Sequence, residues 1–329
     1  MSAVAITGAG AVLEDALEDR LDALPEAARS RALRAERVTQ LALAASGAAL
    51  ADAGLLAVEG DSRADFGIVF GTAFGCFLTN AAYQRRVAAV GTRAASPRLF
   101  AATVSNAAAG EVGIGYRLGG PAVTITAGGA AGLLAIGHAA DAIASARARV
   151  MLAGGVDASG PALARWCADG GLPVGEAPVR GAAAVAVLQS TATANRPGTS
   201  TSRTVLGYVL GYGGGFTPPS EDDGGGVLAA VGQALNQACV RPDQLARMAL
   251  VGGPSAAEPV QGTLRAAFGG ALLAATRPSH DHVERFAAGG PLALLAALTD
   301  ATPDAPFLVL HACSSGHVAA LIAMRTGPA

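Results

Sequence analysis

Residues 123–139, which read VTITAGGAAGLLAIGHA, decide the fold. The first part alternates β-branched and small residues, as a strand does, and the last part repeats apolar residues at helical intervals. Gly128 and Gly129 stand between the two parts, so the order predicts a strand, a tight turn and a helix. Such a turn can hold a nucleophile at a helix N-terminus, but this one carries no Ser, Cys or Thr.

Outward from this stretch, strand and helix patterns alternate along the chain, which predicts an α/β fold with a layered core. Strands are expected at residues 4–10, 66–72, 122–128, 150–156, 182–189, 204–213, 248–253, 272–277 and 307–312. Helices are expected at residues 38–55, 106–118, 132–148, 226–240 and 290–298. The segments 179–189 and 204–213 suggest a hairpin closed by a polar loop.

The order of these elements repeats once. A helix, a polar loop and a strand ending in Gly occupy residues 41–72 and again residues 228–253. Each copy leads to a small-residue turn that opens a helix, at 126–139 and at 284–298. The sequence therefore predicts two copies of one βαβ module.

The composition argues against several classes of function. The net charge is −2 and the charged fraction is 15%, with no basic run, so a nucleic-acid or anionic-lipid partner is not expected. All 23 basic residues are arginine, which excludes lysine Schiff-base chemistry. The four cysteines lie far apart and show no metal-ligand spacing, so we expect reduced thiols, a cytoplasmic protein and no metal.

The uncharged segment 118–140 is long enough to cross a bilayer. Its glycine pair and its polar residues divide it into a strand and a helix, which favours a buried α/β element. The first ten residues, MSAVAITGAG, lack the basic and long apolar regions of a signal peptide and suggest a first strand.

Several stretches together resemble the thiolase-fold β-ketoacyl synthases. Residues 4–12, 37–55 and 66–75 are similar to the family's first strand, first long helix and following strand. Residues 96–127, SPRLFAATVSNAAAGEVGIGYRLGGPAVTITA, resemble its SP-x-x-x-P, N-x-x-A-G and L-x-G-P motifs, and residues 137–158 resemble its A-G-G-x-E region. The resemblance implies a thiolase-like layered αβαβα fold from two related halves, 1–190 and 191–329, in one compact body with its elbow at 128–132.

The resemblance also locates the nucleophile position. In the family, a Gly-Pro pair begins the strand that ends in the catalytic cysteine, and a glycine follows that cysteine by three residues. Counting forward from Gly120 and Pro121, and back from Gly132, both lead to Gly129. Since condensation needs a thiolate to carry the acyl chain, the resemblance implies a chain without the condensing nucleophile.

The family's other catalytic groups are altered as well. The position of the histidine in its His-Gly-Thr-Gly-Thr turn falls on Gly252 or Gly253. In the segment similar to its K-S-x-x-G-H motif, Arg277 stands at the lysine and His282 lies near the histidine. Only vestiges of the catalytic set, Arg277 and His282, are therefore expected.

The family includes catalytically silent chain-length factors, which pair with an active ketosynthase in type II polyketide systems and shape the acyl tunnel. The resemblance implies that this chain is such a subunit, in a polyketide, polyene or fatty-acid-like system. The active ketosynthase would supply the cysteine and histidines, and an acyl carrier protein would deliver substrates on phosphopantetheine. No cofactor of the chain's own is expected.

The same resemblance assigns further positions. The strand before the elbow pairs across the dimer axis in the family, which places four residues at the interface: Val123, Thr124, Ile125 and Thr126. The SP stretch reaches the acyl tunnel, so Leu99 and Phe100 are expected to contact or close it, with ordinary core packing as the alternative. Residues 312–318 match the family's F-G-F-G-G-x-N gate, with Ser314 at the gating aromatic and Gly316 retained.

Two alternatives remain open. Cys313 lies between His311 and His317 in HACSSGH, and a thiolate activated there would make the chain an acyltransferase with a displaced centre, whereas a small packed thiol is the structural alternative. Under this first alternative, the chain could instead be a decarboxylase that uses His282. His280 and His282 form an H-x-H pair, but no third metal ligand lies at a suitable spacing. The second alternative is a homodimeric protein that binds acyl thioesters without a ketosynthase partner.

Overall fold

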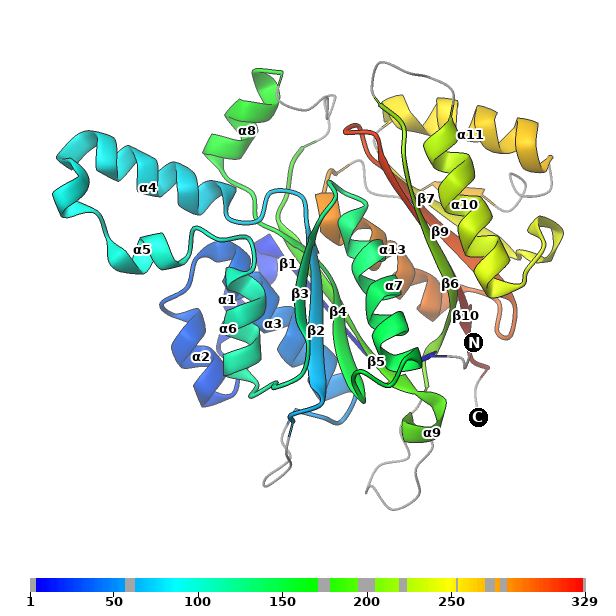
Figure 1. Ribbon diagram of the computed structural model, residues 1–329, viewed down its shortest axis with the longest axis horizontal. Helices are drawn as coiled ribbons and strands as arrows, with labels where there is room; N and C mark the ends of the chain where they lie inside the picture. The colour runs from blue at the N-terminus through cyan, green and yellow to red at the C-terminus, as the bar shows by residue number, and fades with distance from the viewer. Residues whose placement is uncertain are drawn as a thin grey trace.

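One continuous mixed sheet of ten strands organises the described part of the chain (Figure 1). The computed structural model describes residues 4–56, 63–170, 178–194, 205–218, 224–252, 254–269, 276–278 and 283–327. The strands are β1 (Val4–Leu13), β2 (Phe66–Thr72), β3 (Ala122–Thr126), β4 (Val150–Asp157), β5 (Ala182–Ser190), β6 (Gly207–Phe216), β7 (Arg247–Val251), β8 (Thr276–Pro278), β9 (Pro306–Ala312) and β10 (His317–Arg325). Their spatial order is β3-β2-β4-β5-β1-β6-β10-β9-β7-β8.

Helices cover the outer faces of the sheet, and two further helices lie between its two halves. They are α1 (Leu17–Leu21), α2 (Glu26–Ala32), α3 (Arg37–Asp52), α4 (Phe77–Val90), α5 (Pro97–Ala101), α6 (Ala107–Gly115), α7 (Ala131–Ala144), α8 (Pro161–Ala168), α9 (Thr191–Ala194), α10 (Gly225–Ala238), α11 (Pro254–Phe268) and α13 (Gly289–Asp300). In Figure 1, α4 and α5 project away from the body of the molecule. No described helix combines the length and apolar character needed to cross a membrane.

The two ends of the sheet repeat one strand order. Read from either edge towards the centre, the order is β3-β2-β4-β5-β1 in one half and β8-β7-β9-β10-β6 in the other. The halves meet where β1 pairs antiparallel with β6, at Val4 with Val209 and Ile6 with Gly207. The prediction of two related halves is therefore confirmed, whereas the exact division between residues 190 and 191 stays a prediction.

Three apolar clusters define five layers. Side chains of α3 and α6 pack on the outer face of the first half, and those of α10 and α11 pack on the outer face of the second. A third cluster joins α7 and α13 to strands of both halves, so these two helices lie between the halves of the sheet (Figure 1). The resulting αβαβα arrangement is the predicted thiolase-like architecture.

Close approach of helix to sheet explains the glycines of the first strand. A Cβ on Gly10 would overlap the carbonyl of Ala45 and lie 2.5 Å from Ala49 N, both in α3. A shift in register between Ile6 and Gly8 lets Ile6 face the central layer while Val12 faces the outer cluster. Gly8 and Gly10 of β1 therefore allow α3 to pack closely on the strand.

Most predicted elements are present, and the errors concern strand neighbours and elements that the sequence did not predict. The strand core at residues 66–72 and the helix after the elbow are confirmed. The expected hairpin of β5 and β6 is wrong, because β1 lies between them and pairs antiparallel with both. Strand β10 and several helices, among them α4, α8 and α11, were not predicted. Residues 272–275 of the expected eighth strand lie outside the described residues.

Replacing Gly10 by Ala is expected to lower the free energy of unfolding by about 1–3 kcal/mol, because the added methyl must displace the backbone of α3. Gly110 of α6 is the matched control, since a Cβ there meets no atom within 4 Å. Gly110→Ala should raise the free energy of unfolding by about 0.5–1 kcal/mol. Urea unfolding of both variants checks this, and equal stability of the two would contradict the packing account.

Candidate functional site

The elbow lies between an edge strand and a buried helix. β3 ends at Thr126 and α7 begins at Ala131, so the predicted strand, turn and helix are confirmed. Gly128 has a φ of +52°, a conformation that favours glycine, whereas Gly129 does not. The backbone at residue 129 would therefore accept a side chain, and only contacts with neighbouring residues can oppose one.

Those neighbours belong to the far end of the chain, where β9 turns into β10. A Cβ built on Gly129 would lie 2.7 Å from His311 Nε2 and 3.2 Å from Cys313 Cβ. A Cβ on Gly128 would lie 2.5 Å from Ser315 Oγ and 3.2 Å from Cys313 Sγ. Side chains of the second half thus fill the space that a side chain of the elbow would use.

His311 is a deeply buried polar group at this junction. Its side chain is 1% exposed, and burial lowers its pKa to about 4, so the ring is neutral near pH 7. Among the described residues, its Nδ1 has no hydrogen-bond partner. The ring lies between the elbow and the start of α13, where a Cβ on Gly290 would be 3.2 Å from Nδ1.

Three further polar side chains form a chain of contacts in the β9–β10 turn. Cys313 Sγ donates to the His317 carbonyl at 2.9 Å and lies 3.2 Å from Ser315 Oγ. Ser315 Oγ in turn lies 3.2 Å from His317 Nδ1. The exposed Phe216 ring contacts the His317 ring, with centroids 4.9 Å apart. A thiol, a hydroxyl and an imidazole are therefore in series beside the elbow.

A buried carboxylate ties the elbow region together. Asp157, at the end of β4, accepts hydrogen bonds from Thr72 Oγ1 at 2.7 Å, from the N–H groups of Ala73 and Phe74, and from Ala287 N at 3.0 Å. Burial raises its pKa, while these hydrogen bonds act in the opposite direction. Asp157 thereby fixes the turn after β2 and the turn before α13. Asp157 was not among the predicted site residues, although an acidic residue at the end of a buried strand is a signal in the sequence.

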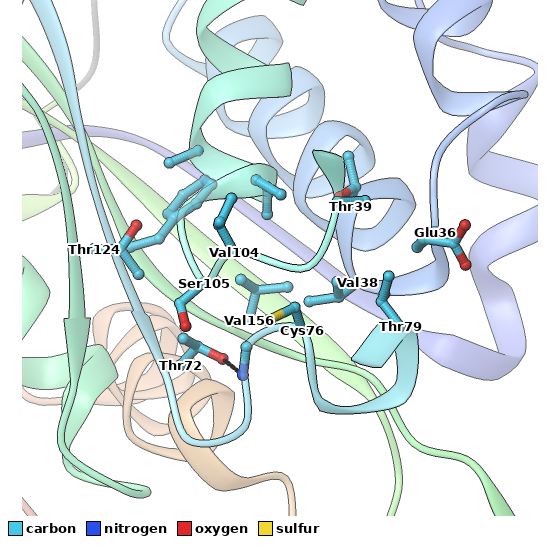
Figure 2. A pocket seen from close by; sticks show the side chains of 16 residues that line it. Glu36, Val38, Thr39, Thr72, Cys76, Thr79, Val104, Ser105, Thr124 and Val156 are labelled. Carbon is cyan, nitrogen blue, oxygen red and sulfur yellow. Dashed lines mark hydrogen bonds between the residues drawn. The ribbon is translucent and has the colours of Figure 1, made fainter. Parts of the chain in front are cut away.

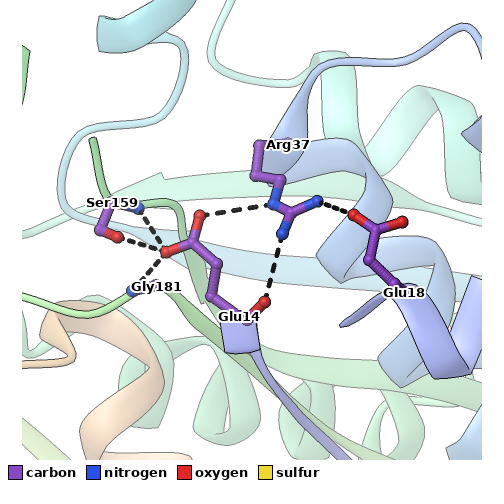
Figure 3. A network of polar contacts seen from close by, with 5 residues as sticks. All are labelled: Glu14, Glu18, Arg37, Ser159 and Gly181. Carbon is purple, nitrogen blue, oxygen red and sulfur yellow. Dashed lines mark hydrogen bonds and ion pairs between the residues drawn. The ribbon is translucent and has the colours of Figure 1, made fainter. Parts of the chain in front are cut away.

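A second carboxylate network holds the outer edge of the same region (Figure 3). Glu14 accepts hydrogen bonds from Ser159, including its N–H at 3.2 Å, and from Gly181 N at 2.9 Å. Arg37 bonds to Glu18 Oε1 at 2.6 Å and to the carbonyl of Glu14. The network joins the ends of β1 and β4 to the start of α3 and β5.

The cavity in Figure 2 lies beside this network rather than at the elbow. It is bounded by α3, the start of α4 and residues 102–109, and hydroxyl groups of Thr39, Thr72, Thr79, Ser105 and Thr124 line it. A neighbouring cavity continues to Arg37, Phe77 and Ala158. The lining of these two cavities does not include Gly129, His311 or Cys313.

The edge strand and the projecting arm expose apolar surface. β3 pairs only with β2 among the described strands, and Val123 is 40% exposed. Phe100 is 61% exposed and contacts the Tyr83 ring, so it is not an ordinary core residue. The other large apolar side chains that are exposed among the described residues of this half are Leu33, Val90, Val104, Ile114 and Trp166. Leu99 is partly buried in α5.

The remaining predicted positions are scattered. Ser314 and Gly316 lie in the β9–β10 turn, next to Cys313. Gly252 follows β7 and is exposed. Arg277 lies in β8. Its side chain is not among the described parts of the structure, and Gly253 and His282 lie outside the described residues. No group of three metal-ligating side chains occurs in the residues that the structure covers.

Comparisons of the sequence with known proteins point in one direction. The family described as "Beta-ketoacyl synthase, N-terminal domain" matches residues 3–169. A 3-oxoacyl-[acyl-carrier-protein] synthase 2 of Vibrio cholerae is 29% identical over 230 residues, 63% of this chain and 54% of the relative. A protein of the same name from Rhizobium meliloti is 35% identical over 118 residues, 35% of this chain and 28% of the relative. The match thus spans about half the length of the first relative and less of the second.

Solved structures with the same fold cover nearly the entire chain. The ishigamide ketosynthase/chain length factor has a TM-score of 0.76 at 21% identity, covering 99% of this chain and 100% of that one. A β-ketoacyl synthase from Burkholderia phymatum has a TM-score of 0.78 at 20% identity, with the same coverage. The AntDE:AntF complex of a type II PKS acyl-carrier protein with its ketosynthase has a TM-score of 0.79 at 17% identity, again with that coverage. These similarities establish the fold.

Replacing Gly129 by Cys is expected to lower the free energy of unfolding by about 1–3 kcal/mol, because the new side chain meets His311 and Cys313. Combining it with His311→Ala should reduce that cost by about 1 kcal/mol, since the second change vacates the space. Urea unfolding of both single variants and the double variant gives the coupling. Additive effects, or a Gly129→Cys variant as stable as the parent chain, would contradict the crowding of the elbow.

Proposed function

The chain belongs to the β-ketoacyl synthase family, and from this premise we propose that it is a non-condensing, chain-length-factor-like subunit. In this proposal it forms a heterodimer with an active ketosynthase and shapes the acyl tunnel of that complex. The system would be a type II polyketide, polyene or fatty-acid-like pathway.

The observation that carries the proposal is the crowding of residue 129. Glycine offers no nucleophilic atom at the tip of the elbow, and a side chain added there would lie 2.7 Å from His311 Nε2. Condensation by the family's usual route needs a thiolate at that place. The second half of the chain occupies the place instead, so restoring a cysteine would require the β9–β10 wall to move.

The rest of the site supports the same interpretation. His311 is buried and neutral near pH 7, with no hydrogen bond to orient its Nδ1 among the described residues. Gly252, at one candidate histidine position, has no side chain to move a proton. In this proposal the partner ketosynthase supplies the cysteine and the histidines.

The proposed surface for the partner subunit is the edge strand β3. An unpaired strand edge presents backbone N–H and C=O groups that another strand can complete, and isolated edges of this kind are otherwise protected by charges. Here the strand is AVTIT, with no charged residue, and Val123 is 40% exposed. The proposed interface strand therefore comprises Val123, Thr124, Ile125 and Thr126. The exposed Val104 lines the same cavity as Thr124.

Substrates would reach the complex on an acyl carrier protein, as the named AntDE:AntF complex illustrates for another protein. The acyl chain would be attached through phosphopantetheine, so the subunit needs no cofactor of its own. Leu99 and Phe100, together with Ser314 and Gly316 near the elbow, would line or close the tunnel. The cytoplasm would be the site of action.

Val123→Arg is expected to weaken association with an active ketosynthase by about 30-fold or more, because a buried charge replaces a central apolar contact. Leu228→Arg in α10 is the matched control, since Leu228 is 37% exposed and Val123 is 40% exposed. Co-expression, size-exclusion chromatography and light scattering measure the complex. Elution of the parent chain only as a homodimer would instead favour the acyl-thioester-binding alternative.

Replacing Leu99 or Phe100 by Ala is expected to lengthen the products of the reconstituted complex if these side chains close the tunnel. The removed side-chain volume becomes available to the growing chain. Mass spectrometry of the acyl chains released from the carrier protein gives the distribution, with Leu228→Ala as control. An unchanged distribution in a folded complex would remove both residues from the tunnel.

A further inference from the structure

We propose that Cys313 is an acyl-accepting thiol, which takes an acyl group from a thioester at the wall facing the glycine elbow. This activity goes beyond the proposed pairing function, because it forms no carbon–carbon bond. It also assigns a nucleophile to the chain at a place different from residue 129.

The thiol is connected to a base through a hydroxyl. Cys313 Sγ lies 3.2 Å from Ser315 Oγ, which lies 3.2 Å from His317 Nδ1. The thiol has one proton, and it can give this proton to the His317 carbonyl at 2.9 Å or to Ser315. In the second arrangement the proton can pass through Ser315 to the imidazole. The contact of the Phe216 ring restrains that imidazole.

His311 is an independent indication that this wall receives a ligand. Its side chain is 1% exposed, and among the described residues its Nδ1 has no hydrogen-bond partner, an arrangement that costs stability. His311 Nε2 lies 2.7 Å from the position of a Cβ on Gly129, and Cys313 Cβ lies 3.2 Å from the same position, whereas Nδ1 lies 3.2 Å from the position of a Cβ on Gly290 in α13. We assign the proton of this neutral ring to Nε2, the nitrogen that faces the elbow.

The glycine pair makes the arrangement possible. Any side chain at residue 128 would meet Ser315 Oγ at 2.5 Å and Cys313 Sγ at 3.2 Å, so glycine there leaves the hydroxyl and the thiol in place. α7 begins at Ala131, whose N–H donates to the Gly128 carbonyl at 3.2 Å, and the positive end of the helix dipole favours negative charge nearby. The residues around Cys313 thus occupy the space that side chains at residues 128 and 129 would need.

The four cysteines differ in access and in partners. Cys76 and Cys167 are buried, whereas Cys313 is partly exposed and Cys239 is exposed. Cys239 Sγ bonds at 3.7 Å to the carbonyl of Asn236 in its own helix. Cys239 therefore provides a control thiol with greater access but without the Ser315 and His317 relay.

The proposed step balances without a further reactant. The Cys313 thiol proton passes through Ser315 to His317, and the sulfur attacks the thioester carbonyl carbon, forming a new C–S bond. The bond from that carbon to the leaving sulfur then breaks, and the leaving thiolate takes the proton from the imidazolium. Return of the acyl group to another thiol is the same step reversed.

Octanoyl-N-acetylcysteamine is the probe for the test. The full-length chain is incubated with it, and intact-mass and peptide mass spectrometry follow the gain of one octanoyl group. We expect the adduct on the Cys313 peptide, its loss in Cys313→Ala and its retention in Cys239→Ala. Ser315→Ala and His317→Gln should slow acylation by about 10²-fold, the usual contribution of a positioned base.

Acylation of Cys239 as fast as Cys313, or an adduct that persists in Cys313→Ala, would show ordinary thiol reactivity and overturn the proposal. Unchanged acylation rates in both relay variants would overturn the role of Ser315 and His317. Circular dichroism confirms that each variant is folded. The association measurement with Val123→Arg does not involve Cys313, so failure of this inference is distinguishable from failure of the proposed function.

Discussion

The absence of room for a side chain at residue 129 is the constraint on which the account depends. The turn after β3 packs directly on His311 and Cys313, and a Cβ there would lie 2.7 Å from an imidazole nitrogen. The backbone of Gly129 would itself allow a side chain, because its φ is not positive. The glycine is therefore required by the opposite wall. An elbow that lost its reactive atom by a single substitution would leave a vacant space, whereas this elbow is filled by residues nearly two hundred positions further along the chain.

The five-layer architecture explains why those distant residues meet. Two halves with one strand order join through the β1–β6 pair, and α7 and α13 lie between them. The first half contributes the elbow, and the second contributes β9, β10 and the turn that carries Cys313. Asp157 links the turn after β2 to the turn before α13, at Ala287 N, and so holds the two sides in register. The site is a property of the junction, and neither half contains it alone.

Much of the fold could be predicted from local patterns, and the site only in part. The elbow was predictable because a β-branched run, a glycine pair and a helical repeat follow each other within residues 123–139. Strand β10 was missed because HVAALIAMR has the alanine and methionine content of a helix, and pairing with β6 and β9 decides its structure. The expected hairpin was wrong because local sequence does not show that β1 inserts between β5 and β6. The closeness of Cys313 to His317 follows from their spacing, but the contact with Gly129 depends on tertiary packing.

The central claim concerns bond formation, and a direct assay of condensation tests it. Purified chain alone, incubated with malonyl- and acyl-loaded carrier protein, should yield no 3-oxoacyl product by mass spectrometry, while an active ketosynthase under the same conditions does. Formation of a new carbon–carbon bond by the isolated chain, at a rate that survives removal of contaminating ketosynthases, would contradict the account.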